Sequence, residues 1–178
     1  MKTLTTKDLA FTSITAAIWA ALNVTIVPLF WQATRLPILC DLIGVSLFVT
    51  TAWWTRKPGA VTLMGLVTTL LNFALRPGAL HFLGFTAAAI FYDAATLLAG
   101  YQGLTTLNSL NLAVTLVLSL CSTAIAGAII GFFFMPPAAL GNYGGVAAFT
   151  LLHAAGGGIG GLLGLVIVKE LTRRGIQG

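Results

Sequence analysis

The chain has 178 residues, of which 58% are hydrophobic and only 7% are charged. A soluble domain carries roughly 25% charged residues, so this composition excludes a soluble globular protein and indicates one that is embedded in a membrane. Nine basic residues against four acidic ones give a formal net charge of +5. The basic residues lie between apolar runs instead of in one cluster, so the sequence indicates no nucleic-acid-binding patch.

Six apolar runs are long enough to cross a hydrocarbon core of ~30 Å, which takes about 20 residues as a helix. The first run follows Lys2 and Lys7 and ends at Pro28. It is interpreted as a retained helix and not as a signal peptide, because the run continues to Val27 and further spans follow. The predicted spans are 9–27, 37–55, 58–75, 79–100, 110–134 and 145–168. Residues 1–178 are therefore predicted to be one all-α membrane domain of six transmembrane helices.

The basic residues also predict the orientation of this bundle, because cytoplasmic segments of membrane proteins are enriched in Lys and Arg. With the N-terminus inside the cell, seven of the nine basic residues are cytoplasmic, and only Arg35 and Arg76 face outward. The reverse topology would invert this ratio. We therefore expect both termini in the cytoplasm and the chain in the plasma membrane.

Small residues recur at the spacing of one helical turn in three spans, a pattern that lets another helix approach closely. The pattern favours either packing inside the bundle or, for the first span, contact with a partner subunit. The residues are Ala16, Ala17, Ala20 and Ala21 in the first span, Gly127 and Gly131 in the fifth, and Gly156, Gly157, Gly160, Gly161 and Gly164 in the sixth.

Cys40 and Cys121 fall in different spans and form no CxxC or Cys/His pattern. We expect two buried thiols, and neither a disulfide nor a metal site.

Polar side chains gather on the outer side of this topology, and ionisable residues inside a span usually face an interior cavity. The inner half carries only helix-end charges such as Asp8, Lys169 and Glu170. This one-sided distribution predicts a ligand pocket open to the outside, and not a path through the membrane. The candidate ligand-binding residues are Trp31, Arg35, Asp41, Asn72, Arg76, His81, Tyr92, Asp93, Asn142, Tyr143 and His153.

Some of these candidates have a structural alternative. Arg76 and His81 are also typical of residues that reach toward lipid headgroups. Trp31 and Tyr143 are either members of the aromatic belt at the membrane surface or stacking surfaces for a flat heterocycle.

Asp93 is expected near the middle of the bilayer, where a carboxylate needs a partner. His153, Arg76 or a bound ligand would serve, and the alternative is a protonated acid. His153 itself either lines the pocket or forms a hydrogen bond between helices.

Six helices, an inside N-terminus, the AxxxA stripe and the polar outer face together resemble the S components of energy-coupling factor (ECF) vitamin transporters. In that family the small-residue motif of the first helix docks on a coupling transmembrane subunit, which implies this role for Ala16, Ala17, Ala20 and Ala21. The family's pocket lies near the outer surface. The resemblance implies that the loop at 28–37 and the loop at 135–144 cover it.

The segment Arg56–Ala60, with the sequence RKPGA, looks like the corresponding stretch of the hydroxymethylpyrimidine/thiamine S components. The similarity favours thiamine or its pyrimidine precursor as the ligand, although Asn72 stands where that branch has an acidic residue. We expect no cofactor and no metal.

On this interpretation the chain binds a ligand and is not an enzyme. It contains no GxxxxGK[ST] phosphate-binding loop, so ATP hydrolysis is expected from two separate ATPase subunits that act through the coupling subunit. The resemblance implies that the bundle topples in the lipid bilayer to carry its ligand inward.

Three other functions stay open. A membrane-embedded enzyme would use Asp93 and His153 as an acid/base pair, although no HExxH or nucleophile motif accompanies them. A structural or assembly subunit of a membrane complex would hold lipid in its pocket. A self-contained secondary transporter is expected to show an inverted repeat, which this sequence lacks.

Overall fold

The computed structural model describes residues 3–101 and 108–176, and all regular secondary structure in these ranges is helical. This confirms the all-α fold class. Lys2 and the middle of the polar segment after the fourth predicted span lie outside the described residues. The helices are α1 (Thr6–Thr34), α2 (Ile38–Thr55), α3 (Ala60–Leu75), α4 (Phe82–Ala99), α5 (Ser109–Phe133), α6 (Pro137–Gly141) and α7 (Val146–Arg173).

Five of the described helices, α1, α2, α4, α5 and α7, are long and apolar enough to cross a membrane. The remaining long helix, α3, is apolar but has only 16 residues, or about 24 Å at the usual rise per residue. Length and composition thus make five of the six predicted spans candidates for crossing a membrane.

The first helix does not end at Pro28 as predicted. It continues through that proline to Thr34, so the segment expected as a loop over 28–37 is mostly helical. Proline removes only its own N–H and strains one turn. In a bilayer the surrounding peptide groups still gain most from intrahelical hydrogen bonds, and a proline is tolerated there.

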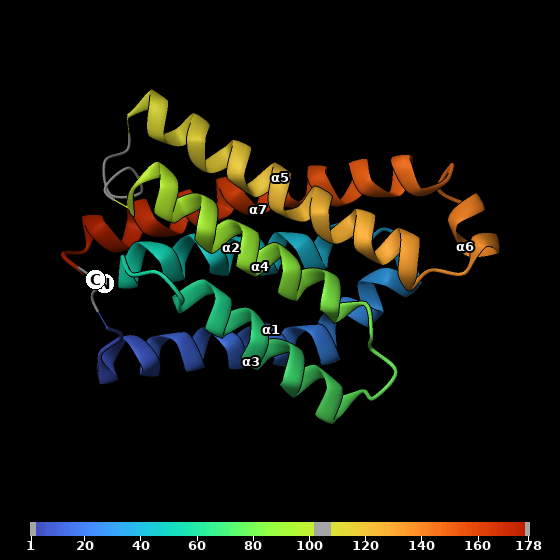
Figure 1. The fold of residues 1–178 in the computed structure, drawn as a ribbon, viewed down its shortest axis with the longest axis horizontal. Helices are drawn as coiled ribbons and strands as arrows, with labels where there is room; N and C mark the ends of the chain where they lie inside the picture. Colours follow the sequence, from blue (N-terminus) through green and yellow to red (C-terminus); the bar gives the residue numbers. More distant parts are fainter. Residues whose placement is uncertain (1–2, 102–107, 177–178) are drawn as a thin grey trace.

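The six long helices pack in a closed circle in the order α1, α2, α7, α5, α4, α3 and back to α1. Helix α2 also contacts α3, α4 and α5, and it is the most buried of the five candidate spans. Figure 1 shows both chain termini at one end of the bundle and the short helix α6 at the other. We call these the termini end and the α6 end.

Glycines let α7 lie against both of its neighbours. Gly156, Gly160 and Gly164 face α2, whereas Gly157 and Gly161 face Ser119 or Thr123 of α5. These stripes therefore serve packing inside the bundle, which was one of the two interpretations of the sequence.

The alanine stripe of α1 is divided between two environments. Ala16 and Ala20 are 0% and 2% exposed and lie in the core, whereas Ala17 and Ala21 are exposed. Of the four alanines, only Ala17 and Ala21 lie on the surface of the chain.

The two cysteines are both free, but only Cys40 is buried. The expectation that both would be buried is wrong for Cys121, which is exposed on α5. In a membrane bundle an apolar side chain gains as much from lipid as from the core, so apolar character does not predict burial there.

Candidate ligand-binding cavity

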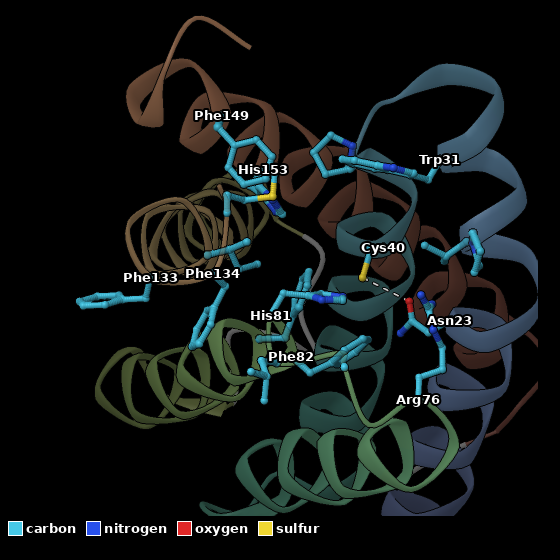
Figure 2. Close-up of a pocket in the computed structure, with 18 of the residues that line it drawn as sticks. Asn23, Trp31, Cys40, Arg76, His81, Phe82, Phe133, Phe134, Phe149 and His153 are labelled. Carbon is cyan, nitrogen blue, oxygen red and sulfur yellow. Dashed lines mark hydrogen bonds between the residues drawn. The ribbon is translucent and has the colours of Figure 1, made fainter. Parts of the chain in front are cut away.

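A cavity of about 500 Å³ lies at the α6 end of the bundle, a volume typical of small-molecule sites. Residues from the last turns of α1 and α5, the first turns of α2, α4 and α7, and the connection between α3 and α4 form its wall. Figure 2 shows His153 on one side of the cavity and Asn23 with Arg76 on the other.

Aromatic side chains form much of this wall. Phe82, Phe85 and Phe149 are each 2% exposed, and Trp31 and Phe134 are half-buried. Rigid rings of this kind offer flat apolar surfaces on which a planar ligand can stack.

His153 and Asp41 form the most buried polar pair at the cavity. Nδ1 of His153 lies 2.9 Å from Oδ1 of Asp41, and the two side chains are 3% and 0% exposed. With Nδ1–H donating to the carboxylate, Nε2 faces away from the pair, and it has no hydrogen-bond partner among the described residues. An unpaired polar atom at such a place costs about 1–3 kcal/mol, which a hydrogen bond to a ligand would offset.

Asn23 on α1 contributes a second polar atom of this kind. Its Oδ1 accepts a hydrogen bond from the Cys40 thiol, with 3.2 Å between sulfur and oxygen. Its Nδ2 lacks a partner in the described part of the chain, and the residue is only 2% exposed. This amide supplies a donor at the cavity wall.

Two further polar residues come from the connection between α3 and α4. Arg76 lines the cavity with an exposed side chain, and His81 lies next to it just before α4. Burial and the nearby Arg76 charge lower the pKa of His81 from 6.5 to about 4. His81 is therefore neutral at pH 7.

Among the predicted ligand-binding residues, Trp31, Arg76, His81 and His153 line this cavity, and Asp41 lies directly behind His153. These residues are far apart in the sequence, and the packing of α1, α2, α4 and α7 brings them together.

Asp93 does not line the cavity, and it does not pair with His153 or Arg76. Its Oδ2 accepts the backbone N–H groups of Gly59 and Thr62 at 2.9 and 3.0 Å, and its Oδ1 accepts the Tyr101 hydroxyl at 3.0 Å. A carboxylate at this place caps the start of α3. The acid/base pair of Asp93 and His153 expected for an enzyme is therefore not formed.

Arg35, Asn142 and Tyr143 lie near the cavity without lining it. Tyr143 donates a hydrogen bond to the carbonyl oxygen of Arg35 at 2.6 Å, and its ring lies 6.1 Å from the Trp31 ring. Asn142 is exposed beside it. Tyr143 thus connects the end of α1 to the segment before α7.

Asn72 and Tyr92 lie inside the bundle. Both are 0% exposed, and Asn72 donates a hydrogen bond to the Thr68 carbonyl oxygen at 2.8 Å. The Tyr92 ring lies 5.6 Å from that of Phe48 in the core.

Sequence analysis missed Asn23 and the phenylalanines of the cavity wall. Asn23 carried a signal, because it is a polar residue near the outer end of the first span. The phenylalanines carried none, since an apolar residue in a membrane span is uninformative by itself. No group of three or more His, Cys, Asp or Glu side chains that could hold a metal occurs among residues 3–101 and 108–176.

The arrangement of the helices is similar to that of a solved S-component of an ECF transporter. The two structures superpose with a TM-score of 0.71 over 98% of this chain and 88% of the other, at 17% sequence identity. The chain shares the S-component fold. No protein-family model and no curated protein sequence matches it.

Proposed function

We propose that this chain is the substrate-capture subunit of an ECF-type importer, and that it binds a water-soluble vitamin or vitamin precursor in the cavity at the α6 end. The observation that carries the proposal is the combination of the S-component fold with a cavity of about 500 Å³ whose wall holds two buried, unpartnered polar atoms. Packing alone would favour apolar side chains at both positions.

In this proposal the bundle crosses the plasma membrane six times, with α3 as the sixth and shortest span, and both termini are cytoplasmic. The supporting observation is the distribution of charge. Among the basic residues that the structure describes, Lys7, Arg56, Lys57, Lys169, Arg173 and Arg174 lie at the termini end, whereas only Arg35 and Arg76 lie at the α6 end. By the enrichment of basic residues in the cytoplasm, the cavity then faces outward.

The partners in this proposal are a coupling transmembrane subunit and two ATPase subunits. Ala17 and Ala21 form the small-residue surface of α1 on which the coupling subunit would dock, because Ala16 and Ala20 are buried. The more specific assignment to thiamine or its pyrimidine precursor rests on Arg56–Ala60. That segment lies at the termini end and contributes no residue to the cavity wall.

Transport by reconstituted vesicles tests the proposal against its rivals. Uptake of a vitamin is expected only when this chain is reconstituted with coupling and ATPase subunits and supplied with ATP. Uptake by the chain alone would favour a secondary transporter, and chemical conversion of the ligand would favour an enzyme. A structural subunit would show neither uptake nor conversion of a vitamin.

A further inference from the structure

The acidic residues of the chain are distributed in a way that bears on the charge of the ligand. The sequence has four of them, Asp8, Asp41, Asp93 and Glu170. Asp8 and Glu170 lie at the termini end, where they pair with Lys57 and with Arg173 and Arg174. Neither can reach a ligand at the α6 end.

The remaining two carboxylates lie outside the cavity wall. Asp93 accepts two backbone N–H groups at the start of α3 and the Tyr101 hydroxyl. Asp41 is 0% exposed; its Oδ1 contacts His153, and its Oδ2 is buried without a hydrogen-bond partner among the described residues. A cationic ligand in the cavity would therefore meet an imidazole or an amide, but no carboxylate in the wall.

In contrast to the carboxylates, a basic residue at the α6 end lies in the cavity wall. Arg76 lines the cavity, its side chain is exposed, and none of the ion pairs in the described residues includes it. Arg35 adds a second positive charge at the same end of the bundle. Such a field concentrates anions at a low-dielectric opening and repels cations.

His81 lies beside Arg76 at the cavity wall. Burial, and to a smaller extent the charges of Arg76 and His153, lowers the pKa of His81. Arg76, and not His81, therefore supplies positive charge at the cavity wall.

On these observations we propose that the ligand is a water-soluble aromatic acid. Its flat ring stacks among Phe82, Phe85, Phe149 and Trp31, and its carboxylate or phosphate binds Arg76. The guanidinium can hold such a group with two parallel hydrogen bonds. Nε2 of His153 and Nδ2 of Asn23 bind the polar edge of the ring. This inference rests on the proposed function and narrows its substrate class, and it disfavours the thiamine cation.

The test combines the naturally bound molecule with matched probes. Wild type, Arg76→Gln and Arg76→Lys are purified in detergent, together with Arg174→Gln as a control that removes an exposed arginine at the termini end. Bound small molecules are identified by native mass spectrometry and extraction. Binding is then titrated with pairs that share a ring and differ in charge, flavin mononucleotide with riboflavin and nicotinate with nicotinamide, and with thiamine as the cation.

The proposal expects an acidic aromatic molecule in the wild type. Arg76→Gln should weaken its binding at least tenfold, Arg76→Lys should weaken it less, and Arg174→Gln should leave it unchanged. Thermal unfolding of each variant verifies that it is folded.

A neutral or cationic vitamin that binds Arg76→Gln as tightly as the wild type would overturn the inference while leaving the proposed function standing. Recovery of phospholipid alone, with no probe or vitamin bound, would overturn both, because Arg76 would then bind lipid headgroups.

Discussion

Gly160 is a position on α7 where the backbone of α2 leaves no space for a side chain. A Cβ atom there would lie 2.8 Å from the Leu42 carbonyl oxygen, 2.9 Å from the Leu42 Cα and 3.0 Å from the Asp41 carbonyl oxygen. Ordinary contact begins at 3.4 Å, so Gly160→Ala forces the two helices apart locally by about 0.6 Å. The neighbouring atoms are backbone and cannot rotate away.

The separation has two expected consequences. Overpacking of this kind costs about 1–3 kcal/mol, which corresponds to a fall in melting temperature of roughly 2–12 °C for a chain of this size. The same separation lengthens the 2.9 Å contact between Asp41 and His153 toward ~3.5 Å, where a hydrogen bond is largely lost. Ligand affinity is therefore expected to fall together with stability.

Thermal unfolding followed by tryptophan fluorescence, with titration of the ligand, measures both effects. Gly158→Ala is the matched control on the same helix, because its Cβ would meet only the Leu120 side chain, with the nearest atom, Cδ2, at 3.0 Å. A flexible side chain can move aside, so this variant should stay close to the wild type. Equal melting temperatures and affinities for the two variants would refute the close approach of α2 and α7.

Two further predictions follow from polar contacts, and a third follows from the proposed orientation in the membrane. His153→Ala leaves the buried carboxylate of Asp41 unpaired, so it should lower the free energy of unfolding by about 3–5 kcal/mol, measured by thermal unfolding, and weaken ligand binding. Asp93→Ala removes the cap of α3 and should lower that free energy by about 1–2 kcal/mol, with ligand affinity unchanged in a titration. In a background without native cysteines, a membrane-impermeant maleimide should label Asn142→Cys in intact cells, and should label Arg174→Cys only after the cells are permeabilised.

Each of these predictions has an outcome that would contradict it. If His153→Ala unfolds like the wild type, the pair with Asp41 does not hold α2 and α7 together. A loss of affinity in Asp93→Ala equal to that in His153→Ala would place Asp93 at the ligand. Labelling of Arg174→Cys in intact cells would reverse the proposed orientation.

The helices were predictable because a single strong signal, continuous apolar runs bounded by charge and proline, determines them. The errors came at places where the bilayer changes the usual rules. Pro28 does not end α1, since unsatisfied peptide groups cost more in lipid than a proline does. Cys121 is exposed because lipid accepts an apolar surface.

The site was predictable only in part, because sequence gives the depth of a polar residue but not its direction around the helix axis. Trp31, Arg76, His81 and His153, four of the predicted ligand-binding residues, line the cavity. Asp93 lies further along α4 than the cavity-lining residues of that helix, and its carboxylate accepts backbone hydrogen bonds at the start of α3. The partner of His153 is Asp41, on a helix more than a hundred residues earlier, and no local pattern indicates this pairing.

The central claim is that the cavity at the α6 end holds a small water-soluble ligand. The most direct test is native mass spectrometry of the detergent-purified protein, with extraction and identification of whatever is bound, in the wild type, Trp31→Ala and Asp93→Ala. The account predicts one vitamin-like molecule per chain in the wild type and Asp93→Ala, and its loss or marked reduction in Trp31→Ala. Recovery of lipid alone from all three, even after incubation with a panel of vitamins, would contradict it.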